Sequence, residues 1–213
     1  MKAVVILGGN MPSKSLIEKY KTHDSIIVCC DSGANCIYKY GMNLDYLFGD
    51  FDSIDSEALK HFKSLNCKIE KYPPEKNSTD SEIAVNKCVQ LGITEIVFLG
   101  FFGSRMDHIL GNIGLLKLCL DKGIKACLVD ENNYIGITNK SIKVKRQEYK
   151  YISFLPYCSK VSKVTLEGSK YALLNYDLYM GDSRTISNEF SDEYISVKFE
   201  SGVLLIIMSS DKI

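Results

Sequence analysis

The sequence predicts an α/β protein of two domains, an N-terminal Rossmann-like α/β domain with a mostly parallel sheet and a C-terminal antiparallel β-sandwich. Over the first 130 or so residues, short apolar runs alternate with helical patterns, which is typical of a parallel sheet covered by helices. After about residue 131, β-branched and aromatic segments follow one another with few helical patterns. We therefore expect domains at residues 1–135 and 136–213.

The strands predicted for the first domain are short and bounded by Gly, Asp or Pro, as parallel strands buried on both faces usually are. They are Ala3–Leu7, Ser25–Cys30, Tyr46–Phe48, Lys68–Lys71, Glu95–Leu99 and Lys125–Val129. The helices predicted between them are Ser13–Tyr20, Ala34–Tyr40, Ser56–Leu65, Asp80–Leu91 and Asp107–Asp121. Gly41, Gly92 and Gly123 stand where left-handed helix caps are expected, and Thr79 and Glu82 have the spacing of a capping box.

In the second domain, segments with strand character are separated by clusters of Gly, Ser and Asn. The predicted strands are Ser141–Arg146, Tyr151–Leu155, Val161–Leu166, Glu193–Phe199 and Gly202–Met208. Short strands joined in this way predict a small antiparallel sandwich or barrel.

The composition excludes several classes of function. Twenty-six basic residues balance 26 acidic ones, so the chain lacks the basic excess that nucleic-acid binding usually requires. No apolar run reaches the roughly 18 to 20 residues that span a bilayer, and the N-terminus resembles a first strand more than a signal peptide. The eight cysteines are scattered without a CxxC pair, mostly within apolar stretches. We expect buried thiols, no membrane association and a cytoplasmic location.

Acidic side chains follow neighbouring strands of the predicted parallel sheet. Asp31 follows the second strand, Asp50 and Asp52 follow the third within the sequence GDFDS, and Asp80 begins the helix after the fourth. Because ligands bind at the carboxyl ends of the strands in open α/β sheets, we expect these four carboxylates to meet at one edge. Four carboxylates in close contact repel one another unless a cation neutralises them.

All-oxygen ligation without His or Cys suits Mg²⁺, which also accepts phosphate oxygens. Gly8, Gly9 and Asn10 follow the first strand and would allow a phosphate to approach the backbone closely. Arg105, after the fifth strand, supplies a forked donor suited to phosphate. The pattern thus predicts a site for Mg²⁺ and a nucleotide.

Each of these loops taken alone also fits an ordinary turn, because Asp and Gly are common turn residues. The chain has neither a P-loop motif nor a GxGxxG motif. Lys76, near the predicted helix start at Asp80, fits either a phosphate contact or an exposed loop residue. An extended backbone in GDFDS would turn Phe51 inward and the two flanking aspartates toward the metal.

Five segments together resemble the thiamine pyrophosphokinase family. They are DSGAN at 31–35, GDFDS at 49–53, STDSE at 78–82, GFFGSRMDHILGN at 100–112 and ISNEF at 186–190. The motifs keep the order and approximate spacing of the family across nearly the whole chain. The resemblance implies an enzyme that transfers the diphosphoryl group of ATP to the hydroxyethyl oxygen of thiamine and releases AMP.

The resemblance also implies a homodimer in which thiamine binds near the subunit interface. By motif position, Asp31, Asp50, Asp52 and Asp80 would hold Mg²⁺ and orient ATP. A second set would bind the nucleotide or its phosphates: Gly8, Gly9, Asn10, Asp31, Lys76 and Arg105. Asp107, Thr185, Ser187 and Asn188 would bind thiamine. Asp50, Asp52, Asp80 and Arg105 would be catalytic, with Asp80 as the candidate acceptor of the hydroxyl proton.

The chain departs from some family members at the thiamine site. Those relatives stack the thiamine ring on a tryptophan, whereas this chain has no Trp. Phe190 or Tyr194 could supply the aromatic face instead. Two alternatives stay open at this point: a related diphosphokinase that acts on a hydroxymethylpterin, and a non-catalytic sensor of a nucleotide or of thiamine diphosphate.

Overall fold

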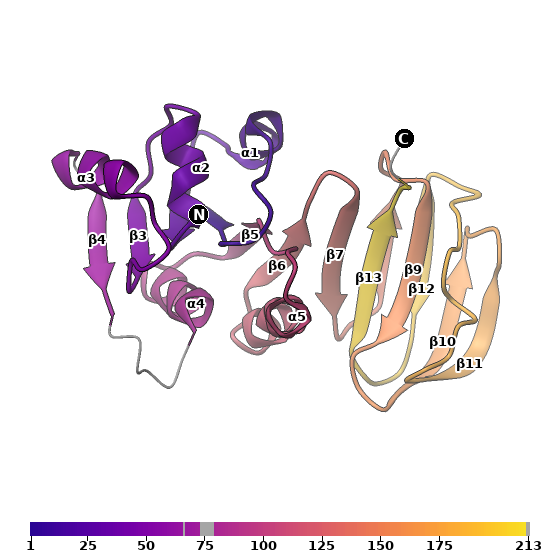
Figure 1. Cartoon of the computed structure of the whole chain (residues 1–213). Helices are drawn as coiled ribbons and strands as arrows, with labels where there is room; N and C mark the ends of the chain where they lie inside the picture. Colours follow the sequence, from indigo (N-terminus) through magenta and orange to yellow (C-terminus); the bar gives the residue numbers. More distant parts are fainter. Residues whose placement is uncertain (66, 73–78, 212–213) are drawn as a thin grey trace. The chain divides into compact units, whose positions relative to one another are not determined.

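The computed structural model describes residues 1–65, 67–72 and 79–211 (Figure 1). The chain divides into two compact units, Met1–Glu131 and Asn132–Ile213. The division falls four residues before the end of the first domain expected from the sequence, because the strand that begins at Asn133 pairs within the second unit.

The first unit is built on a parallel sheet of six strands. They are β1 (Lys2–Ile6), β2 (Ser25–Cys30), β3 (Tyr46–Gly49), β4 (Lys68–Lys71), β5 (Glu95–Leu99) and β6 (Lys125–Val129). Their spatial order is β4-β3-β2-β1-β5-β6, and every pairing between them is parallel. The α/β architecture and all six strands predicted from the sequence are confirmed to within about one residue at each end.

Five helices cover this sheet. They are α1 (Lys14–Tyr20), α2 (Gly33–Lys39), α3 (Ser56–Ser64), α4 (Asp80–Gln90) and α5 (Met106–Asp121). Figure 1 shows α1, α2 and α3 on one side of the sheet and α4 and α5 on the other. The predicted cap at Thr79 is present, because its Oγ1 accepts a hydrogen bond from the Glu82 N–H at 3.2 Å and so fixes the start of α4.

The central strands of the sheet are apolar, since helices bury both of its faces, whereas β4 at its edge (KIEK) is polar. Val4, Val5 and Ile6 of the central strand β1 are fully buried, and so are Phe98 and Leu99 of β5 beside it. In a strand that is buried on both faces, no side chain points to solvent, so successive residues are all hydrophobic instead of alternating with polar ones. The sheet is therefore a rigid platform for the loops at its ends.

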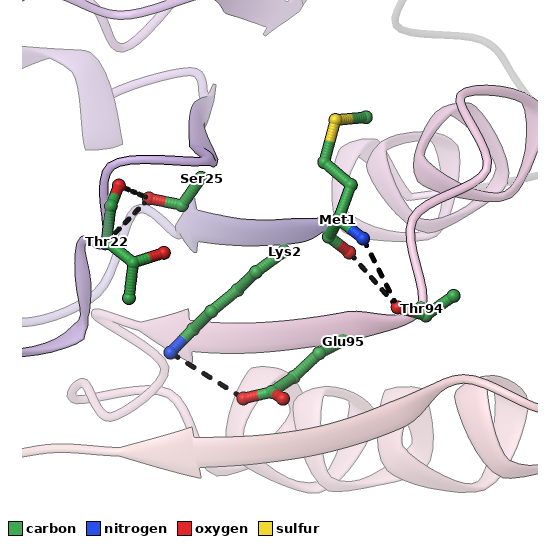
Figure 2. A network of polar contacts seen from close by, with 6 residues as sticks. All are labelled: Met1, Lys2, Thr22, Ser25, Thr94 and Glu95. Atoms are coloured by element: carbon green, nitrogen blue, oxygen red, sulfur yellow. Dashed lines mark hydrogen bonds and ion pairs between the residues drawn. The ribbon is translucent and has the colours of Figure 1, made fainter.

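Polar contacts tie together the amino-terminal ends of the strands (Figure 2). The Lys2 ammonium of β1 lies 3.6 Å from the Glu95 carboxylate of β5. Thr94 donates its backbone N–H to the Met1 carbonyl at 3.0 Å, and its hydroxyl contacts Met1 as well. This edge holds β1 and β5 in register and lies opposite the carboxyl ends at which the acidic residues gather.

The second unit is an antiparallel β-sandwich, as predicted. One layer contains β7 (Asn133–Thr138), β13 (Leu204–Ser209) and β9 (Tyr151–Pro156), with β13 in the middle. The other has the order β11-β10-β12-β8, with β8 at Ile142–Lys145, β10 at Lys160–Glu167, β11 at Leu173–Tyr179 and β12 at Tyr194–Lys198. Side chains of both layers, Phe154 and Ile206 facing Leu166 and Val197 among them, form one buried core.

Two strands of the sandwich are missing from the sequence-based prediction. β7 contains Gly136 and begins with Asn133, and β11 contains Asn175 and Asp177, all of them residue types that strands usually avoid. Pairing with β13 and with β10 supplies the stabilisation that local propensity does not.

None of the helices in the described part of the chain is long and apolar enough to cross a membrane. The eight cysteines are free thiols.

Candidate functional site

A cavity of about 1020 Å³ opens in the first unit at the carboxyl ends of the strands. β1 lies between β2 and β5, so the chain adds strands to one side of β1 and later to the other. The cavity is lined by the loops after β1, β2 and β5 and by the first turns of α4 and α5, at the edge of the sheet where open α/β proteins bind ligands. The residues that the sequence predicts to form the site and that line this cavity are Gly8, Gly9, Asn10, Asp31, Asp80, Arg105 and Asp107.

Close backbone contact between two loops forms the floor of the cavity. Gly9 donates its N–H to the Gly100 carbonyl at 2.9 Å, and Asn10 donates to the Phe102 carbonyl at 2.6 Å. A Cβ atom on Gly9 would lie 2.2 Å from the Phe102 oxygen, well inside van der Waals contact. Glycine at position 9 therefore allows the loops after β1 and β5 to meet, and the exposed backbone of 8–10 stays accessible to a ligand.

Asp31 and Asp80 lie against one another within the cavity. Partial burial of Asp31, the charge of Asp80 and a hydrogen bond to Asp80 together raise the Asp31 pKa to about 7. The Phe51 N–H donates a hydrogen bond to Asp31 Oδ1 at 3.2 Å and lowers the Asp31 pKa, whereas the negative charge of Asp50 raises it. Two carboxylates this close repel one another when ionised, and a cation bound between them would relieve that repulsion.

Asp50 and Asp52 lie beside the cavity rather than in its lining. Asp50 is half-buried and accepts a hydrogen bond from the Asp52 N–H at 3.0 Å, whereas Asp52 is exposed. The expectation of an extended backbone here is wrong, because Phe51 adopts a left-handed φ of 69°. This turn brings the Phe51 N–H onto Asp31 and leaves Phe51 half-buried instead of turned fully into the core.

Among the residues that the structure describes, no three His, Cys, Asp or Glu side chains form a metal-binding group. The donor set at Asp31 and Asp80 nevertheless fits Mg²⁺, which typically takes one or two protein carboxylates and completes its shell with water and phosphate oxygens. Burial, and after it the charge of Asp80, raise the Asp31 pKa, and a cation at this position would offset the repulsion between the two carboxylates.

Arg105 and Asp107 stand at the entrance to α5 and bind one another. Arg105 Nη2 lies 2.5 Å from Asp107 Oδ2, and both side chains are about two-thirds exposed. The guanidinium lowers the Asp107 pKa to about 2, so this carboxylate is ionised at neutral pH. A forked donor and a carboxylate are thus held side by side at the cavity wall.

The remaining predicted residues lie elsewhere. Lys76 falls outside the described residues. Thr185, Ser187 and Asn188 belong to the second unit; Thr185 and Asn188 are buried, and Ser187 is exposed. For the aromatic contact, Phe190 is half-buried against the core of the sandwich, whereas Tyr194 is 43% exposed on β12.

The structure adds a wall of α5 whose residues the sequence analysis gave no individual role. Gly111, Asn112, Leu115 and Leu118 line the cavity from this helix. Asn112 Nδ2 donates to the Phe101 carbonyl at 2.9 Å and so anchors the helix to the loop after β5. Glycine inside a helix lowers the stability of the helix by about 1 kcal/mol relative to alanine. Gly111 within the predicted helix was therefore the feature of the sequence that could have indicated a close approach of a ligand to α5.

Both units match families of known proteins. The family model of the catalytic domain of thiamin pyrophosphokinase matches residues 17–128. The model of the vitamin B1 binding domain of thiamin pyrophosphokinase matches residues 139–204. Together these matches span most of the chain, one on each side of the division between the two units.

Individual relatives agree with the family models. Thiamine pyrophosphokinase of Bacillus subtilis (strain 168) is 31% identical over 216 residues, which cover 99% of this chain and 100% of the relative. A solved structure of thiamine pyrophosphokinase from Bacillus subtilis has a TM-score of 0.91 and 28% identity, with 100% of each chain covered. That of thiamin pyrophosphokinase from Geobacillus thermodenitrificans has a TM-score of 0.87 and 30% identity, covering 100% of this chain and 99% of its own. The chain belongs to the thiamine pyrophosphokinase family.

Proposed function

We infer that the chain is a thiamine diphosphokinase, which transfers the diphosphoryl group of ATP to the hydroxyethyl oxygen of thiamine and yields thiamine diphosphate and AMP. Two observations together carry this inference. Carboxylates and an arginine line the cavity at the carboxyl ends of the strands. The chain is also similar over its full length to a thiamine pyrophosphokinase. The two alternatives, a diphosphokinase that acts on a hydroxymethylpterin and a non-catalytic sensor, have no comparable support.

The residues of the cavity have distinct roles in this proposal. The backbone of Gly8, Gly9 and Asn10 contacts the nucleotide, and the absence of side chains at the two glycines allows close approach. Arg105 binds phosphate oxygens and stabilises the charge that develops on them during transfer. Asp80 accepts the proton of the thiamine hydroxyl as the new oxygen–phosphorus bond forms. Lys76 is proposed as a further phosphate contact.

We propose Mg²⁺ as the cofactor, held by Asp31 and Asp80, with Asp50 and Asp52 adjacent to the site. The ion, when bound, neutralises the phosphate oxygens and removes the repulsion between Asp31 and Asp80. The aspartates fix the position of the diphosphoryl group, and because transfer of this kind depends mainly on positioning and electrostatics, losing a carboxylate lowers turnover.

Thiamine recognition is proposed to involve Asp107 from the first unit and the segment that contains Thr185, Ser187 and Asn188 from the second. In this proposal the protein is a homodimer with thiamine near the subunit interface. A cytoplasmic location is supported by the eight free thiols, which suit a reducing compartment. Light scattering after gel filtration measures the oligomeric state directly.

One experiment tests the function. The purified protein is incubated with ATP, Mg²⁺ and thiamine, and AMP and thiamine diphosphate are measured by chromatography; parallel reactions contain a hydroxymethylpterin or EDTA. We expect both products with thiamine, none with the pterin and none with EDTA. If AMP formed only in the presence of the pterin, the acceptor would be the pterin and not thiamine. If the protein bound nucleotide but formed no AMP with either acceptor, it would be a sensor.

A further inference from the structure

A cluster of charged and aromatic side chains lies between β3, β4 and α4. Lys68 and Glu70 of β4 point to the same face of the sheet, because alternate residues of a strand share a face, and Tyr72 follows two residues later. The Tyr46 hydroxyl of β3 accepts a hydrogen bond from the Lys68 ammonium at 3.3 Å, and Lys87 reaches the cluster from α4. None of these five residues lines the cavity, so the proposed function gives them no role.

Glu70 is the centre of the cluster. Its Oε1 lies 2.6 Å from the Lys87 ammonium, and its Oε2 accepts a hydrogen bond from the Tyr72 hydroxyl at 2.7 Å. The Glu70 and Lys87 side chains are 34% and 25% exposed, so water screens this ion pair less than it screens a fully exposed one. The contacts with Lys87 and Tyr72 lower the Glu70 pKa, so the carboxylate is ionised at neutral pH and both of its oxygens are bound.

Lys87 connects α4 to two strands of the sheet. Besides its ion pair with Glu70 of β4, its ammonium lies 5.9 Å from the centre of the Tyr46 ring on β3. A cation over an aromatic face is attracted to the ring. Tyr46 is only 7% exposed, and its ring stacks on that of the fully buried Phe48, with 5.9 Å between the ring centres. The Lys87 ammonium is therefore held by groups that belong to the sheet itself.

Apolar packing alone does not determine how α4 lies on the sheet. The helix packs on β2 and β3, and its buried residues Ala84, Val85 and Cys88 all have small side chains. Hydrophobic contacts are non-directional, so small side chains of this kind leave a helix some freedom to slide or rotate. The ion pair with Glu70 removes that freedom, because the ammonium and the carboxylate must stay within contact distance of one another.

Asp80, the first residue of α4, lies seven residues before Lys87. With about 3.6 residues per turn, residues seven apart are separated by roughly 10 Å along the helix axis and by only about 20° around it. Asp80 and Lys87 therefore project from the same side of the helix. A shift or rotation of α4 that broke the contact between Lys87 and Glu70 would also move Asp80 away from Asp31, against which it lies in the cavity.

We propose that Glu70 is a positioning residue for the cavity, which acts on Asp80 by binding Lys87. It holds α4 in the orientation that places Asp80 against Asp31. The inference rests on the proposed function, in which Asp80 holds Mg²⁺ and accepts the hydroxyl proton, whereas Glu70 and Lys87 contact neither substrate nor metal. Because residues 79–82 in and before the first turn of α4 form part of the cavity wall, the orientation of this helix also decides the shape of that wall.

Lys87→Gln is the first test, and Lys160→Gln is its matched control. Lys160 forms an ion pair with Asp177 at 3.0 Å, with side chains 38% and 30% exposed, but in the second unit. Isothermal titration calorimetry measures the Kd of Mg²⁺ in the presence of α,β-methylene-ATP, an analogue that cannot transfer its diphosphoryl group. We expect Lys87→Gln to raise this Kd roughly three- to ten-fold and to lower kcat by a similar factor, because Asp80 is displaced. Lys160→Gln should change neither value, whatever its effect on the melting temperature.

A double-mutant cycle tests whether the ion pair acts through Asp80. Glu70→Gln keeps an acceptor for the Tyr72 hydroxyl but removes the charge that binds Lys87, so its effect on the Kd of Mg²⁺ should match that of Lys87→Gln. In the Asp80→Asn background, Lys87→Gln should have little further effect on this Kd, because the carboxylate that it positions is already absent.

Amide hydrogen exchange in the metal-free protein gives a readout that needs neither Mg²⁺ nor turnover, and it replaces the cycle should Asp80→Asn bind Mg²⁺ too weakly to measure. The Ile83 N–H donates to the Thr79 carbonyl at 3.0 Å in the first turn of α4. We expect this N–H to exchange faster in Lys87→Gln than in the wild type, since the helix is less firmly held, and at the wild-type rate in Lys160→Gln.

The outcomes separate the role of Glu70 from the function on which it rests. An active protein whose Lys87→Gln variant binds Mg²⁺ as tightly as the wild type overturns the positioning role. Effects of Lys87→Gln and Asp80→Asn that multiply overturn action through Asp80. A wild-type protein that forms no AMP in the presence of ATP, Mg²⁺ and thiamine overturns the proposed function, whereas exchange at Ile83 still decides whether the ion pair holds α4.

Discussion

The Arg105 guanidinium contacts both carboxylate oxygens of Asp107, with Nη2 2.5 Å from Oδ2 and Nε 3.2 Å from Oδ1. The pair stands where the loop after β5 enters α5, so the two residues share one wall of the cavity. A bidentate contact of this kind fixes the plane of the guanidinium, which Lys cannot reproduce. Arg105 is thereby pre-oriented toward the phosphates that we propose it binds.

Arg105→Lys tests this orientation. The variant keeps the positive charge but loses the fork, so we expect kcat/KM for ATP to fall about 10²-fold, as for the loss of one preorganised donor to the transition state. Steady-state kinetics with ATP as the varied substrate measure the effect. Lys117→Ala is the matched control, because Lys117 forms an exposed ion pair with Asp121 on the same helix and does not line the cavity. A near wild-type rate in Arg105→Lys would contradict a specific phosphate contact.

Gly9→Ala should damage both stability and activity. The added Cβ would lie 2.2 Å from the Phe102 carbonyl oxygen and 2.4 Å from that of Gly100, so the loops after β1 and β5 must separate. We expect a loss of about 1–3 kcal/mol in the free energy of unfolding, measured in urea, and a higher KM for ATP. Gly103→Ala is the control, since its Cβ would meet only an ordinary contact at 3.6 Å in the same cavity. Equal effects of the two variants would rule out the proposed loop contact as the cause.

The pH dependence of stability should reveal the contact between Asp31 and Asp80. In the metal-free protein burial and Asp80 raise the Asp31 pKa to about 7 from 3.8, so the folded state holds a proton that the unfolded chain has released. Raising the pH from 3.8 toward 7 therefore lowers the free energy of unfolding. Asp31→Asn removes this loss, and we expect it to stabilise the protein in EDTA at alkaline pH by about 1–2 kcal/mol, after allowance for solvent screening.

Thermal melts in EDTA at several pH values, with and without added Mg²⁺, measure this effect. Mg²⁺ should raise the melting temperature of the wild type above pH 7 and that of Asp31→Asn much less, since a ligand that binds only the folded state stabilises it. Asn also tolerates the left-handed φ of 42° at position 31. An Asp31→Asn variant less stable than the wild type in alkaline EDTA would contradict the repulsion.

The sequence allowed most of the first unit to be predicted, because local patterns decide its elements. β2, β4, β5 and β6 begin and end at the predicted residues, since each is a short run whose ends are marked by turn residues. The proximity of Asp31 and Asp80 in one cavity could be predicted because parallel strands end at the same edge of a sheet.

Other features depend on tertiary contacts that no local pattern records. The left-handed turn at Phe51 separates Asp50 and Asp52 from the lining of the cavity, and a strand-like alternation could not anticipate it. β11 carries Asn175 and Asp177 against its local propensity, because pairing with β10 holds it. The burial of Asn188 likewise follows from its contacts with Tyr171, which lies 17 residues earlier in the chain.

The eight thiols should differ sharply in reactivity. Cys29, Cys30, Cys36, Cys88, Cys119 and Cys127 are buried, and Cys67 and Cys158 are partly exposed. Burial raises the pKa of Cys36, Cys88 and Cys119 to about 12, so these thiols are almost entirely protonated near pH 8 and unreactive toward disulfide reagents. We expect Ellman's reagent to label at most two thiols rapidly in the native protein and all eight in concentrated guanidinium.

Replacing Cys67 and Cys158 with serine should abolish the rapid phase and leave only the slow reaction, which is limited by opening of the fold. The same variant should keep its activity, because neither residue lines the cavity. A rapid phase that persists in this variant, or more than two thiols labelled at once in the native wild type, would mean that the core of the first unit opens more readily than its burial indicates. The slow phase should lengthen when Mg²⁺ and ATP are added, since ligands that bind only the folded protein suppress its opening.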